Sequence, residues 1–140
     1  MPVSPLLMRK TGNNMVEAAK KKVLVVDDDL MAVSLMSRAI LNMGFEVFKA
    51  YNGLEALAAI KEELVDLIIL DQMMPKMNGI KTCALIKIDS RYRHIPVIMF
   101  TASADESDRK ISEQVGANAF CNKPLDVALL TQKIQEFLKT

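Results

Sequence analysis

Three short runs of β-branched and other apolar residues constrain the fold of this chain most strongly. They are VLVV at 23–26, LIIL at 67–70 and VIMF at 97–100, and each is followed at once by a polar residue. An apolar run that does not alternate with polar residues is typical of a strand buried on both faces, as in parallel sheets covered by helices. Shorter runs at 46–50 and 119–122 predict two further strands.

Segments with the apolar spacing of helices separate these strands. Val33, Met36, Ile40 and Met43 share one face of a predicted helix, which Gly44 ends. The other predicted helices cover residues 54–64, 80–88, 105–116 and 127–138. Strands that alternate with helices predict an α/β fold with a doubly wound, five-stranded parallel sheet and right-handed crossovers.

The segment 105–116 is less apolar than the other predicted helices. Its large apolar residues are Ile111 and Val115, which we expect to anchor it to the rest of the domain. A helix with so few anchors is predicted to be lightly packed and easy to displace.

Length and charge divide the chain into two parts. A chain of 140 residues with 51% hydrophobic residues is sufficient for one domain, which we place at residues 21–140. Residues 1–20 are expected to be a flexible basic extension, because the first 22 residues contain five Lys or Arg and one Glu. The remainder has a net charge of −3. An acidic domain argues against direct nucleic-acid binding, which needs clustered basic residues.

Cysteine use and hydropathy predict a cytoplasmic protein. Cys83 and Cys121 lie in apolar stretches without the spacing of a metal site, so we expect buried thiols in a reducing compartment. The apolar residues near the start form a stretch too short for a signal peptide or a spanning helix. No membrane association is expected.

Polar residues stand at the carboxyl ends of four predicted strands. They are Asp27, Asp28 and Asp29 after the first, Asp71 after the third, Thr101 after the fourth and Lys123 after the fifth. In the strand order 2-1-3-4-5 the second strand is at the outer edge, so these four ends are neighbours. Open parallel sheets bind ligands at this edge, where the strand order reverses. We therefore expect one polar pocket.

Carboxylates gathered in one pocket repel one another unless a cation lies among them. Mg²⁺ prefers one or two carboxylates with other oxygen ligands, and it commonly binds together with a phosphate. An aspartate beside such an ion can attack phosphorus and form an aspartyl phosphate. Lys123 would pair with the new phosphoryl group and the Thr101 hydroxyl would donate to it. The pocket therefore predicts phosphoryl chemistry at Asp71.

The aspartate run also has a simpler interpretation, as a turn that caps the next helix. Asp29 is the expected cap. For Asp27 and Asp28, the polar residues at the other strand ends favour a metal pocket. His94 is the single histidine and falls in a predicted loop, where we expect an ordinary solvated side chain rather than a phosphorelay histidine.

Four motifs together resemble the receiver domains of two-component response regulators. They are VVDDD at 25–29, DQMMPKMNG at 71–79, FTA at 100–102 and NKPL at 122–125. Each motif alone is a weak signal, but their order and spacing are specific, and the resemblance covers roughly residues 21–139. It implies a flavodoxin-like receiver fold similar to that of single-domain chemotaxis regulators, with a cis peptide expected before Pro124.

The resemblance also implies a role for each polar residue. The implied catalytic residues are Asp71, which accepts the phosphoryl group, Thr101 and Lys123. The implied Mg²⁺ ligands are Asp27, Asp28, Asp71 and the main-chain carbonyl of Met73. The implied switch residues are Thr101 and Phe120. Phe120 departs from the chemotaxis receivers, which have tyrosine there, and Met73 stands where some relatives have an amide. Both departures concern the lifetime of the phosphoryl group and the form of the output.

The function implied is that of a signalling switch rather than an enzyme with an external substrate. A sensor histidine kinase or a histidine phosphotransfer protein would supply the phosphoryl group. The domain would catalyse only its own phosphorylation and dephosphorylation, and the face made by 105–116, 119–122 and 127–138 would bind a downstream protein. An output regulator, a phosphorelay shuttle and a phosphate sink all stay open from the sequence.

Two other function classes fit the sequence less well. Phosphohydrolases that use Mg²⁺ and an aspartate nucleophile typically carry a second catalytic aspartate two residues later, where this chain has Met73. A flavodoxin-like cofactor binder needs a phosphate loop rich in Ser, Thr and Gly where residues 27–29 are all aspartate.

Overall fold

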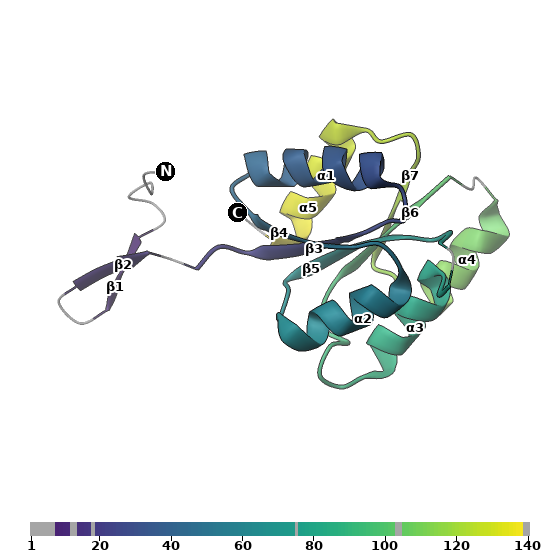
Figure 1. Cartoon of the computed structure of the whole chain (residues 1–140), viewed down its shortest axis with the longest axis horizontal. Coiled ribbons are helices and arrows are strands. Elements are labelled where there is room, and N and C mark those ends of the chain that lie inside the picture. The colour runs from purple at the N-terminus through teal and green to yellow at the C-terminus, as the bar shows by residue number, and fades with distance from the viewer. Residues whose placement is uncertain (1–7, 12–13, 18, 75, 103–104, 139–140) are drawn as a thin grey trace.

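A five-stranded parallel sheet forms the centre of the computed structural model, which describes residues 8–11, 14–17, 19–74, 76–102 and 105–138 (Figure 1). The strands are β3 (Lys22–Val26), β4 (Glu46–Ala50), β5 (Leu67–Asp71), β6 (Val97–Thr101) and β7 (Ala119–Asn122). Their order is β4-β3-β5-β6-β7, which confirms the predicted doubly wound topology.

Helices cover both faces of the sheet (Figure 1). They are α1 (Leu30–Asn42), α2 (Gly53–Glu62), α3 (Gly79–Ile88), α4 (Glu106–Gln114) and α5 (Val127–Leu138). In Figure 1, α1 and α5 lie above the sheet, while α2 and α3 lie below it with α4 at their right. The five helices correspond to the five predicted from apolar spacing.

The sheet separates two apolar cores, which explains the unbroken apolar runs. Val23 and Val25 of β3 face the core beneath α1 and α5, whereas Leu24 and Val26 face the core beneath α2 and α3. Successive side chains of a strand point to opposite faces, so a strand covered on both sides needs an apolar residue at every position.

Side-chain caps start four of the helices, and the sequence predicted one of them. Asp29 caps α1 by accepting from the main-chain N–H groups of Met31 and Ala32, as predicted. Asn52, Asn78 and Asp105 cap α2, α3 and α4 in the same way. Gly44, which follows α1, has a φ of +92°, a conformation that glycine adopts without strain.

The expected anchoring of α4 is wrong in one respect. Ile111 points to solvent with 43% of its surface exposed, while the small residue Ser112 is the buried one. Val115 does pack partly against the core, as predicted. The helix therefore turns Ser112, rather than its large apolar side chain, toward the domain.

The first part of the chain contains an element that the sequence interpretation lacked. Strands β1 (Met8–Thr11) and β2 (Asn14–Glu17) form an antiparallel hairpin, which Figure 1 shows apart from the sheet. Residues 1–7, 12–13 and 18 lie outside the described residues, so a domain boundary near residue 20 stays a prediction. None of the described helices has the length and apolarity needed to cross a membrane.

Other details agree with the sequence. The peptide between Lys123 and Pro124 is cis. Cys83 and Cys121 are buried free thiols, and His94 is exposed in the segment before β6.

Candidate functional site

The sheet register brings the polar strand ends to one level. Val26, which precedes Asp27, pairs with Leu70, which precedes Asp71. Thr101 at the end of β6 pairs with Asn122 of β7, and the Thr101 carbonyl accepts a hydrogen bond from the Lys123 N–H at 2.7 Å. The carboxyl ends of β3, β5, β6 and β7 therefore form one edge, as predicted.

Three carboxylates meet at this edge. Oxygens of Asp27, Asp28 and Asp71 all lie within 4.8 Å of one another. Asp27 is fully buried and Asp71 is 2% exposed, whereas Asp28 is exposed at the mouth of the pocket. Like charges this close raise the energy of the ionised pocket, and burial adds to that cost.

Lys123 provides the cationic partner within the pocket. Its Nζ lies 3.3 Å from Oδ2 of Asp27 and 3.4 Å from Oδ1 of Asp71. Burial acts to lower the pKa of Lys123, but the charges of Asp71 and Asp27 outweigh it and the pKa is raised. The lysine is therefore a full positive charge between two aspartates.

Asp71 has a strongly altered acidity. Burial, followed by the negative charge of Asp27, raises the pKa of Asp71 to about 7 from an ordinary 3.8. The charge of Lys123 and the hydrogen bond from the Met73 N–H, 3.2 Å long, act in the opposite direction. One lysine thus does not compensate for the crowded carboxylates.

The donor set fits a hard divalent cation. Oδ1 of Asp27 accepts a hydrogen bond from the Asp29 N–H, whereas its buried Oδ2 has only the Lys123 ammonium, 3.3 Å away, as a partner within the described residues and accepts no hydrogen bond there. Carboxylate oxygens with spare lone pairs, one exposed aspartate at the entrance and an excess of negative charge are what Mg²⁺ requires of a partly hydrated site.

Close backbone packing holds Asp71 in place, and the sequence indicated this only in part. A side chain at Gly79 would lie well inside contact distance of the Asp71 carbonyl oxygen and 2.8 Å from Cα of Gln72. The Gly79 N–H donates to the Gln72 carbonyl at 2.9 Å, so the start of α3 is fastened directly behind Asp71. The sequence indicates Gly79 only as the last residue of the motif at 71–79. Pro75 of the same loop lies outside the described residues.

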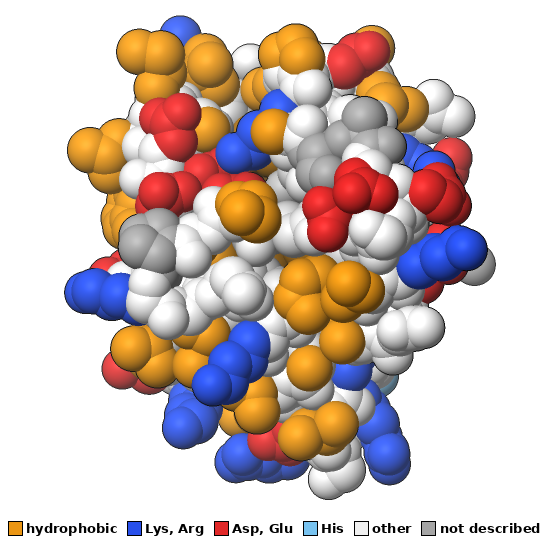
Figure 2. All heavy atoms as spheres, turned by 90° about the vertical axis from the view of Figure 1, so that its right-hand side faces the viewer, with side chains coloured by type: hydrophobic (Ala, Val, Ile, Leu, Met, Phe, Trp, Pro, Cys, Tyr) orange, Lys and Arg blue, Asp and Glu red, His pale blue; other side chains and the backbone are white. Residues whose placement is uncertain are grey.

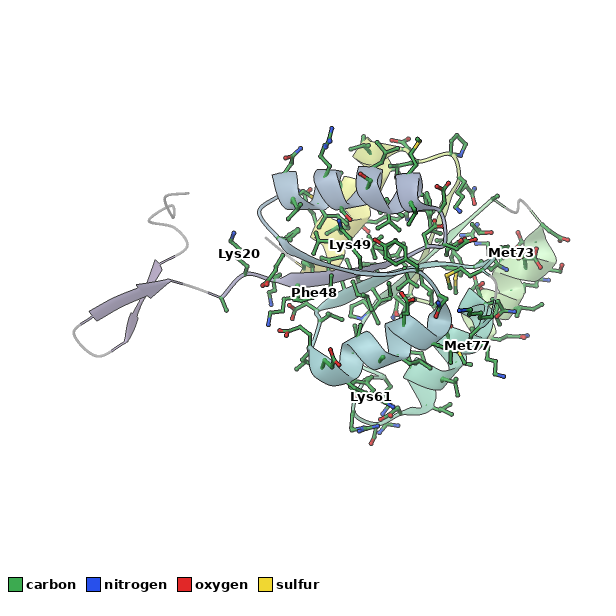
Figure 3. The ribbon with its side chains drawn as sticks, in the orientation of Figure 1. Lys20, Phe48, Lys49, Lys61, Met73 and Met77 are labelled. Carbon is green, nitrogen blue, oxygen red and sulfur yellow. The ribbon has the colours of Figure 1, made fainter. Side chains whose placement is uncertain are left out.

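The remaining predicted site residues surround the pocket. Thr101 is buried at the end of β6, while the Met73 side chain is 69% exposed beyond the end of β5, at the right of Figure 3. Phe120 of β7 lies away from the carboxylates. It is half-buried and pairs with Met99 of β6. The guanidinium of Arg109 on α4 stands over its ring, 5.1 Å from the centroid, a contact that the sequence did not indicate.

Comparison with known proteins identifies the family. The model of the response regulator receiver domain matches residues 23–135, which is most of the chain. The chain belongs to the response regulator receiver family. Receiver domains act in two-component signalling, where they interact with histidine kinases and downstream targets.

Named relatives agree with this assignment. The polar-differentiation response regulator DivK of Brucella anthropi is 35% identical, over 84% of this chain and 96% of the relative. The probable transcriptional regulator ycf27 of Cyanophora paradoxa is 36% identical over 88% of this chain, which spans 50% of that protein. The structure of the Vibrio cholerae chemotaxis protein CheY4 matches with a TM-score of 0.81 and 31% identity, covering 85% of this chain and 99% of the other.

Proposed function

We propose that Asp71 accepts a phosphoryl group from a phosphohistidine of a sensor histidine kinase or a histidine phosphotransfer protein. The observation that carries the proposal is the group of three carboxylates within 4.8 Å, two of them bridged by Lys123. The Mg²⁺ ligands would be Asp27, Asp28, Asp71 and the main-chain carbonyl of Met73. Mg²⁺ would supply positive charge that keeps Asp71 ionised and neutralises the phosphoryl oxygens.

Residues of the chain account for the rest of the chemistry. An Oδ of Asp71 forms the bond to phosphorus while the bond from phosphorus to the donor imidazole breaks, which leaves an aspartyl phosphate. Lys123 leaves its contact with the Asp71 carboxylate and pairs with one phosphoryl oxygen. The Thr101 hydroxyl donates a hydrogen bond to another phosphoryl oxygen. The domain thus performs only its own phosphorylation and later hydrolysis. The apolar Met73 replaces the second carboxylate that a phosphohydrolase would need.

An apolar surface beside the pocket supports docking of the phosphoryl donor. Met31 is 70% exposed on α1, and Leu35 is half exposed one turn further on. Both line a cavity of about 210 Å³ that also includes Lys123 and Leu125. A donor histidine must come within bonding distance of Asp71, so a partner helix against α1 would place it correctly. The buried free thiols support a reducing, cytoplasmic setting for this exchange.

The test is phosphorylation by acetyl phosphate, followed by intact-protein mass spectrometry. With Mg²⁺, the wild type should gain the mass of one phosphoryl group and Asp71→Asn should gain none. Glu62→Gln, an exposed carboxylate on α2, is the matched control and should behave as the wild type. A modification that persisted in Asp71→Asn would refute the assignment.

Magnesium affinity gives a second, separate prediction. Asp28→Ala should weaken Mg²⁺ binding about tenfold, because it removes a carboxylate from the entrance of the pocket while leaving the buried pair intact. Isothermal titration at pH 8 would measure this, with Glu62→Gln again as the control. Equal affinities of Asp28→Ala and the wild type would exclude Asp28 as a ligand.

We further propose that the face formed by α4, β7 and α5 transmits the signal. Thr101 moving toward the phosphoryl group would vacate space beside β6, and Phe120 would rotate into it. Burial of an aromatic ring is worth about 1.5 to 3 kcal/mol, enough to shift a two-state equilibrium by tenfold or more. Arg109 covers the ring in the structure described, so this movement requires the ring to leave that contact.

Phe120→Ala should therefore leave the phosphorylation of Asp71 nearly unchanged but reduce its effect on α4 and β7 several-fold. Amide hydrogen exchange with and without beryllofluoride, a mimic of the phosphoryl group, measures this effect. Phe137→Ala on α5, also half-buried, controls for general loosening. Identical exchange of α4 and β7 in the two states of the wild type would show that this face does not respond.

A further inference from the structure

A groove between α2 and α3 lies at the opposite end of the sheet from the acidic pocket. It encloses about 420 Å³ between the carboxyl-terminal parts of the two helices and the turn at 89–92. Leu57 and Ile60 of α2 and Leu85 and Ile88 of α3 give it an apolar lining. No step of the proposed phosphoryl chemistry uses this groove.

Apolar residues make up much of the outer surface of α3, whose only charged residues are Lys81 and Lys87. Cys83 and Ile86 are buried in the core, yet Leu85 is only partly covered and Ile88 is 77% exposed on the other side. A helix with apolar residues on most of its surface is ordinarily covered on more than one side.

The rim of the groove has an excess of positive charge. Arg91 holds Asp89 through two hydrogen bonds, from Nε at 3.1 Å and Nη2 at 2.8 Å, and its guanidinium lies 4.9 Å from the ring centroid of Tyr92. The pair therefore cancels its own charge and is fixed in position. Hydrogen bonds from the side chain and the main-chain N–H of Arg91 are the main causes that lower the pKa of Asp89. The charge of Lys61 lowers it further, so Lys61 lies near this carboxylate.

Lys61 is the lining cation that this pair does not use. It makes no ion pair with any residue that the structure describes. Lys61 is on the side of α2 away from the sheet in Figure 3. Figure 2 views the molecule from the other end, where the acidic pocket lies, and shows Lys and Arg side chains along its lower edge. An apolar floor with cations at its rim complements a helix that has one apolar side flanked by carboxylates.

We propose that this groove docks an acidic amphipathic helix of a partner protein. Apolar residues spaced i, i+3 and i+7 would fill the groove against Leu57, Leu85 and Ile88, and a flanking Glu or Asp would pair with Lys61. The basic N-terminal segment of the chain has the wrong sign of charge to take this place. Because the groove is remote from Asp71, the partner binds equally well whether or not Asp71 is phosphorylated.

The probe is a synthetic 16-residue peptide with leucines at helical spacing and glutamates on either flank. A second peptide with the same leucines and lysine flanks is its control. Titration of isotope-labelled protein, followed by NMR, should show the acidic peptide shifting the amides of α2 and α3 and those of residues 89–93. The lysine peptide should bind roughly fivefold or more weakly. Beryllofluoride with Mg²⁺ should leave the affinity of the acidic peptide unchanged.

Two variants test the assigned residues. Ile88→Glu, at a site exposed enough to fold normally, should weaken binding about tenfold, and Lys61→Glu should remove the preference for the acidic peptide. Matched controls are Leu41→Glu, an exposed apolar residue on α1, and Lys49→Glu, an exposed lysine on β4, and both should bind as the wild type.

Three outcomes would overturn the proposal. Equal binding of both peptides, no binding of either, or shifts confined to α1 or α4 would each exclude the groove as an acidic-helix site. A wild type that dimerised with rising concentration, and an Ile88→Glu variant that did not, would show that the groove binds a second copy of the chain instead. Failure of acetyl phosphate to modify Asp71 would affect the proposed function and leave these results unaltered.

Discussion

In metal-free buffer at pH 8, Asp71→Asn is expected to have a free energy of unfolding about 2 kcal/mol larger than that of the wild type. The substitution keeps the size of the side chain and removes one negative charge from beside Asp27. Burial and that neighbour raise the pKa of Asp71 to about 7, so ionisation of the folded protein is costly. The expected increase in the free energy of unfolding is smaller than the full shift in the pKa of Asp71 would predict, because solvent reaches the pocket past Asp28 and screens the charges.

The pH dependence follows from the direction of this shift. A carboxyl group whose pKa is higher in the folded state than in the unfolded state holds its proton more tightly when folded. Its contribution to stability is therefore fully present below the unfolded value near 4, and it is lost as the pH rises through about 7. The advantage of Asp71→Asn should accordingly shrink toward pH 5.

Urea denaturation at pH 5, 6.5 and 8 in the presence of EDTA measures the effect. Glu62→Gln should show no such trend, since this carboxylate is exposed. Saturating Mg²⁺ at pH 8 should narrow the difference by stabilising the wild type. A wild type that proved more stable than Asp71→Asn at pH 8 without metal would show that Lys123 compensates the pocket fully.

Gly79→Ala is expected to destabilise the fold by about 3 kcal/mol. Gly79 opens α3, and helix propensity alone predicts that alanine there would stabilise the protein by up to about 1 kcal/mol. The added methyl group would instead press against the Asp71 carbonyl oxygen and the backbone of Gln72. Backbone atoms cannot rotate away as a flexible side chain can, so the start of α3 must shift.

Gly44→Ala is the matched control for this prediction. Gly44 lies just after the end of α1, whereas Gly79 is the first residue of α3. A side chain at Gly44 would meet no atom within 4 Å. Its cost is limited to the left-handed backbone conformation, about 1 to 2 kcal/mol. Thermal or urea denaturation of both variants would decide: a Gly79→Ala protein as stable as the wild type would mean that the contact behind Asp71 is loose.

The strands and the polar residues at their ends were predictable because each depends on local sequence, and the strand order was predictable because the doubly wound fold class implies it. Unbroken apolar runs determine which strands are buried on both faces, and the polar residue after each run determines what stands at the sheet edge. Asp27, Asp71 and Lys123 were placed together in this way, and their distances in the structure agree with that placement. The resemblance to receiver domains then added roles that spacing alone does not assign.

Features that depend on packing between distant segments were not predictable. The sequence shows Ile111 as a large apolar residue of α4, but the structure buries Ser112 and exposes Ile111, which depends on how the helix is turned against the domain. The contact of Arg109 with Phe120 joins a helix to a strand and has no signature in either segment. The space behind Asp71 that excludes a side chain at Gly79 likewise exists only after β5 and α3 have packed.

The separation of two cores by one sheet has a consequence for assembly. The donor surface on α1 and the groove between α2 and α3 belong to opposite faces of the sheet, so neither partner would obstruct the other. A single domain could then hold a phosphoryl donor and a second protein at once, in a complex of three chains. Such an arrangement raises the effective concentration of the donor near whatever the groove has captured. The domain would act as an adaptor as well as a switch, and its position in the cell would follow the partner rather than the phosphoryl group.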